Sequence, residues 1–126
     1  MVFEVESRKP VAEIDAGLHE AAARHGFGVP TVHNLRETMQ RKGVDFQGEC
    51  VIYEVCNPYR AKAVLEANPV ISTALPCRIS LYHAGEAYRL ATILPTAMMR
   101  MFDTPQVESV AREVENIVVA IMKEAA

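Results

Sequence analysis

The segment TPQVESVAREVENIVVAIM, residues 104–122, decides the fold that the sequence predicts. Thr104 has the side chain of an N-cap and Pro105 suits the first helical position, so we expect a long helix to begin here. Its apolar residues recur at helical spacing; they are Val107, Val110, Ala111, Val114, Ile117, Val118, Ile121 and Met122. A stripe of this width has to lie across something large and flat, and a β-sheet is the simplest partner.

A second long helix is predicted near the N-terminus. Pro10 opens it, and Gly26 is a natural residue to end it, because glycine readily adopts the left-handed conformation that follows many helices. The apolar stripe of this helix contains Val11, Ile14, Leu18, Ala21 or Ala22, and His25.

Five segments have the composition or the alternation of β-strands. They are residues 3–5, 27–32, 50–56, 77–82 and 88–94. Gly28 and Pro30 make the second segment a weak candidate for a central strand. The segment 83–86 is expected to turn the chain between the last two strands, which would then form a hairpin.

Short helices are expected between the strands. They cover residues 35–42, 58–67 and 95–102, with one further turn after Asn68. The order of all these elements predicts an α+β fold in a single domain, residues 1–126. In this architecture a mainly antiparallel sheet of about five strands carries the two long helices on one face, and the short helices are inserted between strands.

The composition is that of an ordinary soluble globular protein. Half of the 126 residues are apolar, 23% are charged and the formal net charge is −3. We expect no nucleic-acid partner, because the most basic stretch, residues 36–42, contains Glu37 and fits the exposed face of a short helix. No apolar run approaches the ~20 residues of a membrane helix. Three cysteines and an N-terminus without signal-peptide features indicate reduced thiols in the cytoplasm.

A homodimer is expected from the amount of hydrophobic surface. The last helix is very apolar, and Met98, Met99, Met101 and Phe102 form a second apolar cluster before it. Together they offer more hydrophobic surface than five short strands can cover, and exposed patches of this kind usually mark an interface.

The stretch EVCNP, residues 54–58, places a thiol at the junction between a strand and a helix. Asn57 has the side chain of an N-cap, and Pro58 fits the first helical position. Cys56 therefore precedes a helix N-terminus, and thiols in such places are generally more acidic than free cysteine. Desolvation by the apolar strand acts in the opposite direction. If the strand end opens into a pocket, we expect the effect of the helix N-terminus to exceed that of desolvation, so that Cys56 is alkylated before Cys50.

The spacing of the cysteines limits how they can pair. Cys50 and Cys56 lie about 20 Å apart on a regular strand at ~3.3 Å per residue, whereas a disulfide needs Cα atoms within roughly 7 Å. Cys77, like Cys56, lies at a strand end beside a proline, so this pair can come together. The alternative is that all three cysteines are small buried hydrophobic residues, the common role of free cysteine.

No metal site is expected. His19 and His25 are six residues apart and lie about 120° apart around a helix, whereas metal-binding histidines on one helix face are four residues apart. The remaining cysteines and histidines are too scattered for a structural zinc site. The sequence also lacks a glycine-rich phosphate loop and a Gly-x-Ser-x-Gly nucleophile motif.

Several segments together resemble one known family. They are Gly26-Phe27-Gly28-Val29, Lys42-Gly43-Val44-Asp45-Phe46, Val55-Cys56-Asn57-Pro58, Leu65-Glu66-Ala67-Asn68-Pro69 and Leu75-Pro76-Cys77-Arg78. In order and spacing they are similar to the family known as domain of unknown function 302, over residues 2–122. The resemblance implies a small bacterial or archaeal α+β domain that tends to form homodimers and has no established activity. The positions that match the family pattern are Cys56, Asn57, Pro58, Pro76 and Cys77, whereas Cys50 is peculiar to this chain.

Two classes of function fit these observations. The first is a small-molecule or cofactor binding module, of unknown ligand, with a pocket near the helix start at residues 56–58 and the strand start at residues 76–78. Its candidate ligand-binding residues are Cys56, Asn57, Pro58, Cys77 and Arg78. Arg78 alternates away from Cys77 on its strand, so it is an anion clamp if its face lines a cavity and a solubilising residue if that face is solvent.

The alternative is a thiol-dependent redox or sulfur-transfer protein, with Cys56 and Cys77 as the candidate catalytic residues. No histidine adjoins Cys56 in the sequence, which disfavours hydrolytic cysteine chemistry unless His33 or His83 folds close to it. A third hypothesis is a structural partner domain without a ligand.

Overall fold

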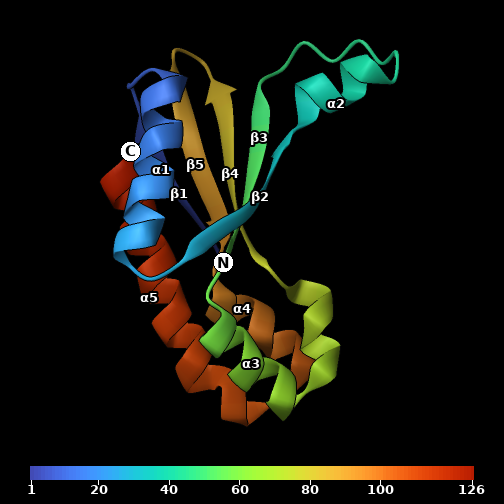
Figure 1. The fold of residues 1–126 in the computed structure, drawn as a ribbon, viewed down its shortest axis with the longest axis vertical. Coiled ribbons are helices and arrows are strands. Elements are labelled where there is room, and N and C mark those ends of the chain that lie inside the picture. The colour runs from blue at the N-terminus through green and yellow to red at the C-terminus, as the bar shows by residue number, and fades with distance from the viewer.

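Five antiparallel strands form one sheet in the computed structural model, which describes residues 1–126 (Figure 1). They are β1 (Val2–Ser7), β2 (Gly28–Asn34), β3 (Cys50–Cys56), β4 (Cys77–Ala84) and β5 (Ala87–Ile93). Their order across the sheet is β1-β5-β4-β3-β2, so β1 and β2 are the edges. β2 is an edge strand, as Gly28 and Pro30 predicted, and its pairing with β3 is irregular between Gly28 and Thr31.

Two long helices, α1 (Val11–Arg24) and α5 (Glu108–Ala125), lie side by side over one face of the sheet (Figure 1). Three shorter helices are inserted between strands or before α5: α2 (Leu35–Arg41), α3 (Pro58–Ala67) and α4 (Pro95–Met99). α3 and α4 gather below one end of the sheet, whereas α2 lies beyond the other end (Figure 1). The predicted α+β architecture is therefore confirmed. None of the helices combines the length and the apolar composition that a membrane span requires.

Local sequence signals explain where the short helices begin. The Asn34 side chain accepts a hydrogen bond from the Glu37 backbone N–H at 3.2 Å and caps α2. Asn57 caps α3 in the same way, accepting from the Arg60 N–H at 3.1 Å, and Pro58 occupies the first turn. Both predicted caps are confirmed, because each needs only residues three positions apart.

The predicted cap of the last helix is wrong in detail. Thr104 makes no capping hydrogen bond, and the chain passes through a 3-10 turn, Pro105–Val107, before α5 begins at Glu108. The Thr104 hydroxyl instead donates to the Phe102 carbonyl and accepts from the Asn68 side-chain amide, both at 2.9 Å. Asn68 is distant in the sequence, so a cap predicted from local spacing could not include the hydrogen bond that engages the Thr104 hydroxyl instead.

The hydrophobic core consists of two clusters. The main cluster lies between the sheet and the two long helices; its fully buried members include Ile14, Leu18, Tyr53, Ile79, Leu81, Leu90, Val118, Ile121 and Met122. The smaller cluster lies at the α3 end and is built on Val64, Ile71 and Val107, with Leu75, Met99, Phe102 and Val110 packed against it. α5, about 27 Å long at 1.5 Å per residue, lies along the main cluster, and the turn that leads into it supplies Val107 to the other.

The predicted stripes are largely buried, with a few exceptions. Val114 and Ile117 of α5 are half-buried and pack against the main cluster. Val11, the first residue of α1, is 37% exposed. Gly17 allows the two helices to approach closely, since a Cβ atom added at this residue would lie 3.3 Å from the Ala125 Cα atom.

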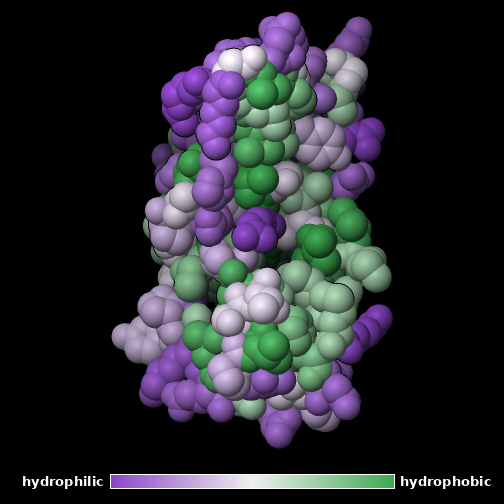
Figure 2. Space-filling model, turned by 90° about the vertical axis from the view of Figure 1, so that its right-hand side faces the viewer, coloured by the Kyte–Doolittle hydropathy of each residue, from purple (hydrophilic) through white to green (hydrophobic).

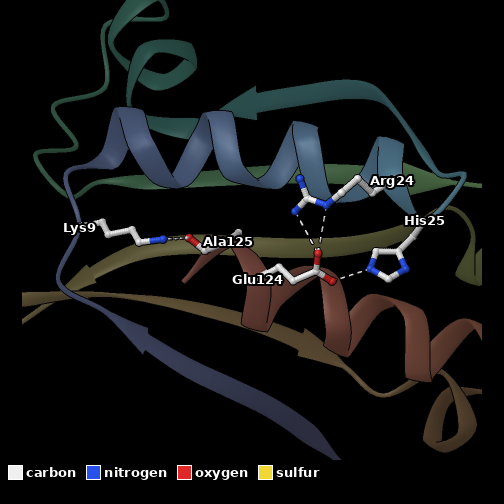
Figure 3. A network of polar contacts seen from close by, with 5 residues as sticks. All are labelled: Lys9, Arg24, His25, Glu124 and Ala125. Atoms are coloured by element: carbon white, nitrogen blue, oxygen red, sulfur yellow. Dashed lines mark hydrogen bonds and ion pairs between the residues drawn. The ribbon is translucent and has the colours of Figure 1, made fainter.

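A polar network ties the C-terminal ends of α1 and α5 together (Figure 3). The Glu124 carboxylate accepts hydrogen bonds from Arg24 Nη2 at 2.9 Å and from Arg24 Nε at 3.2 Å, and it contacts His25 Nε2 at 2.5 Å. His25 therefore ends α1 with an ionic contact rather than as part of the apolar stripe. The bonds from His25 and then Arg24 lower the pKa of Glu124 below its ordinary value.

We predict that this network makes a small contribution to stability that disappears in acid. Because the pKa of Glu124 is lower in the folded chain than in the unfolded chain, its contribution is present above about pH 4.5 and is lost as the pH falls through the folded-state pKa. Glu124→Gln should therefore lower the melting temperature at pH 7 by more than it does at pH 3, because the contribution of Glu124 decreases as the pH falls below about 4.5. Glu20→Gln, at an exposed α1 position, is the control and should change neither value. An equal difference between wild type and Glu124→Gln at both pH values would contradict the prediction.

Candidate functional site

A cavity of about 360 Å³ lies where the end of the sheet meets α3. The sheet contributes Val55, Cys56 and Cys77, and the turn before β2 contributes Phe27. Arg60, Ala61, Val64 and Leu65 come from α3, and Val114 comes from α5. Asn57, Ser72, Leu75 and Pro76 complete the wall. Phe27, Val55 and Cys77 belong to the main core cluster, and Val64 and Leu75 to the smaller one. The cavity is therefore the junction that the two clusters leave open.

The structure places four of the expected site residues around this cavity: Cys56, Asn57, Pro76 and Cys77. Pro58 is not part of the wall, and its role is to begin α3. The peptide bond between Leu75 and Pro76 is cis, and β4 begins at the next residue.

Asn57 has a positioning role. Its amide nitrogen donates to the Gly26 carbonyl at 2.9 Å, while its amide oxygen caps α3 through the Arg60 N–H. Gly26 occupies the turn after α1 with φ of +74°, a conformation that glycine adopts without steric cost. Asn57 thus holds the start of α3 against the turn between α1 and β2, and both groups of its amide are already engaged.

Arg78 does not reach the cavity of Cys56 and Cys77. It alternates to the opposite face of the sheet, where it is exposed and lies beside Glu54 of β3 in the strand register. There it lines a separate hollow of about 240 Å³ together with Pro76, Ser80 and Ile93. The expected single pocket that holds both Cys77 and Arg78 is therefore not formed, because neighbouring residues of a strand point to opposite faces.

The three cysteines have different surroundings. Cys77 pairs with Val55 in the β3–β4 register, one residue before Cys56, and both cysteines are half-buried at the cavity. Burial, and to a smaller extent the nearby Cys56 thiol, raises the pKa of Cys77 to about 11. Cys77 is therefore protonated at neutral pH. Cys50 lies at the other end of β3, opposite Tyr82.

Arg60 is the wall residue that the sequence did not reveal. Its guanidinium forms an ion pair with Glu113 of α5 through Nη2, and its Cζ atom lies 5.9 Å from the centre of the Phe27 ring. The Nε atom is fully buried and finds no acceptor among the protein atoms. A buried donor without a partner costs about 1–3 kcal/mol, and more when it carries charge. The only sequence signal for Arg60 is its place one turn after Asn57.

The other hollows differ in chemistry. A depression of about 390 Å³ beside α4 and the start of α5 is slightly larger, but only one of its eight lining residues, Met99, is apolar. Small-molecule sites are usually concave, mostly apolar and equipped with a few converging polar groups. The cavity at Cys56 and Cys77 has this character, so we regard it as the candidate site. No three His, Cys, Asp or Glu side chains converge closely enough to hold a metal ion.

Comparison with known proteins places the chain among relatives of the same fold. Residues 3–125 match the family described as "Domain of unknown function DUF302". The crystal structure of an uncharacterized conserved DUF302 protein from Bacillus stearothermophilus is similar with a TM-score of 0.93 and 29% sequence identity. The alignment covers 99% of this chain and 98% of that one. No curated protein matches the sequence.

We predict that the three thiols are alkylated at different rates. Limiting iodoacetamide at pH 7 should label Cys56 first and Cys77 last, because only the thiolate reacts and the pKa of Cys77 is raised to about 11. Mass spectrometry of the digested protein measures the order, and unfolded protein in guanidinium chloride provides the control in which the rates converge. Labelling of Cys77 as fast as Cys56 in the folded protein, or of Cys50 before Cys56, would contradict this.

Proposed function

This chain belongs to the DUF302 family, and we propose that it is a binding module for a small, largely apolar molecule held in the cavity between the sheet and α3. The observation that carries the proposal is the composition of the cavity wall. Nine of its thirteen residues are hydrophobic, and its volume of about 360 Å³ lies within the usual range of ligand sites. Transfer of apolar surface from water into such a wall is favourable by about 25 cal/mol per Å².

The position of the cavity also supports a binding role. α3 is held at its start by Asn57, which bonds to the turn after α1, and further along by Val64 in the smaller cluster. Val114 of α5 lines the cavity between the two clusters. The walls are thus anchored on both sides, which keeps the cavity open at little conformational cost to a ligand.

Thiol-dependent redox or sulfur-transfer chemistry with Cys56 and Cys77 is the second candidate. One observation favours it, since both thiols line the same cavity. The raised pKa of Cys77 disfavours it, because a protonated thiol is a poor nucleophile. Cys56 alone would have to begin such a reaction, so we favour the binding function over the redox function.

Filling the cavity tests the proposal. Ala61 lines it and Ala63, two residues later on α3, is exposed and does not. We predict that the wild-type protein binds octan-1-ol saturably with one site per chain. Ala61→Phe should weaken this binding by about tenfold or more, because each methylene kept out of the wall forfeits about 0.8 kcal/mol.

Isothermal titration calorimetry measures both affinities, and Ala63→Phe is the matched control that should bind as the wild type does. Absence of saturable octan-1-ol binding to the wild type, or equal binding to Ala61→Phe, would refute the proposal.

We also propose that the chain forms a homodimer. The apolar stripe of α5 is largely covered within the chain, so the exposed hydrophobic surface lies elsewhere. Ile93 of β5 is 49% exposed, and its neighbour Val2 on β1 is 56% exposed. Hydrophobic residues also run down the middle of the side shown in Figure 2, between hydrophilic ends. Such patches usually mark protein contacts.

Analytical ultracentrifugation should therefore give about twice the chain mass of 13.9 kDa at micromolar concentration. Ile93→Arg should shift the mass to that of the single chain, because an arginine in the apolar contact would be desolvated without a partner. Val11→Arg, at a residue 37% exposed at the start of α1, on the side of the sheet that the helices cover, is the control and should leave the dimer intact. A wild-type mass of one chain would end the proposal.

A further inference from the structure

We propose that residues 35–49, which are α2 and the loop after it, form an arm that docks into the hollow at Arg78 on a second copy of this chain. This inference rests on the proposed homodimer and names the surfaces that join its two subunits. It follows from the exposure of the arm, from the lining of the hollow and from the charges that each of them leaves unpaired.

The arm has little contact with the rest of its own chain. It projects on the side of the sheet opposite to α1 and α5, and α2 packs mainly on β2 and β3, the strands that it connects (Figure 1). None of its residues is buried, although four of them are large and apolar: Leu35, Met39, Val44 and Phe46. Helices as short as the seven residues of α2 are marginal in water by themselves, so a surface that covers these side chains would stabilise the arm.

The tip of the arm, residues 44–46, has a defined shape. The Val44 N–H donates to the Met39 carbonyl at 2.9 Å, and the Gln40 side chain donates to the Phe46 carbonyl at 3.3 Å. These bonds hold the loop against α2. The tip therefore presents Asp45 between two apolar residues in a preformed loop, which reduces the conformational entropy lost on docking.

The hollow at Arg78 offers a surface of matching character. Its volume is about 240 Å³, and five of its nine lining residues are hydrophobic, namely Val2, Ala74, Ala91, Ile93 and Met98. Val2 and Ile93 are the exposed apolar residues of the proposed dimer contact, so an arm docked here would cover them.

The charges of the two surfaces are complementary. Glu54, the neighbour of Arg78 in the strand register, pairs with His33, and Arg78 forms no ion pair within the chain. Asp45 forms no ion pair either and only accepts a hydrogen bond from the Gln47 side chain. An aspartate flanked by apolar residues thus matches an arginine in an apolar hollow.

The arm and the hollow lie on the same side of the sheet, at opposite ends. The arm joins the end of β2 to the start of β3, whereas the hollow lies where β1 and β4 begin and β5 ends. A two-fold axis across the middle of this side exchanges the two ends. Each arm then meets the hollow of the partner, and the contact is made twice in one dimer.

Charge reversal on the two surfaces tests the inference by analytical ultracentrifugation. Asp45→Arg and Arg78→Asp should each raise the dissociation constant of the dimer at least about tenfold, because like charges then face each other at both contacts. An equimolar mixture of the two variants should dimerise as the wild type does, since every arm and hollow in the mixed pair again carry opposite charges. This recovery also shows that both variants are folded.

Glu20→Arg is the matched control, at an exposed position on α1 away from both surfaces. It should leave the dimer intact by itself, and its mixture with Arg78→Asp should contain no mixed dimer of wild-type affinity.

The outcomes separate this inference from the homodimer itself. If the wild type dimerises and either reversal leaves the dissociation constant unchanged, the homodimer stands and the docked arm is overturned. The inference also fails if both variants are single chains and their mixture stays so, because the loss then does not come from a contact between arm and hollow. A wild-type mass of one chain overturns both proposals.

Discussion

The packing of α5 along the sheet and down to α3 is the interaction on which the rest of the structure depends. The C-terminal half of α5 contributes Val118, Ile121 and Met122, all fully buried, to the main cluster between α1 and the sheet. The turn that leads into it contributes Val107 to the smaller cluster around Val64 and Ile71. A single rigid helix therefore sets the distance between two cores that do not merge. Val114 packs against the main cluster and also lines the cavity that lies where the two clusters do not meet.

This division of the core connects stability with the proposed function. A fully packed junction would be more stable, because close packing is the normal state of protein interiors. Here the junction instead keeps a cavity whose wall is mostly apolar. Ligand binding would cover that wall, so it would stabilise the contact between the two halves of the fold.

Much of the fold could be predicted from the sequence, because its determinants are local or periodic. The alternation of Cys77, Ile79 and Leu81 identifies a strand, and Asn34 and Asn57 each cap the helix that follows. The site could be predicted only in part from the sequence. The cavity lies near Cys56 and Cys77 as expected, and Arg78 points to the opposite face of the sheet as its alternation with Cys77 indicated, so it does not line this cavity. Arg60 could not be predicted, because a charged residue on a short helix normally faces solvent, and its contacts with Phe27 and Glu113 join residues that are far apart in the sequence.

The central claim is that the junction between the two clusters is a cavity that admits an apolar molecule, and the methyl groups of Ala61 and Val114 line it. Their ¹³C–¹H methyl resonances should be recorded during a titration with octan-1-ol, together with the methyl resonance of Ala63, which is exposed on the same helix outside the wall. The account predicts saturable shifts for Ala61 and Val114 and little change for Ala63. Resonances of Ala61 and Val114 that are unchanged at saturating octan-1-ol would contradict it.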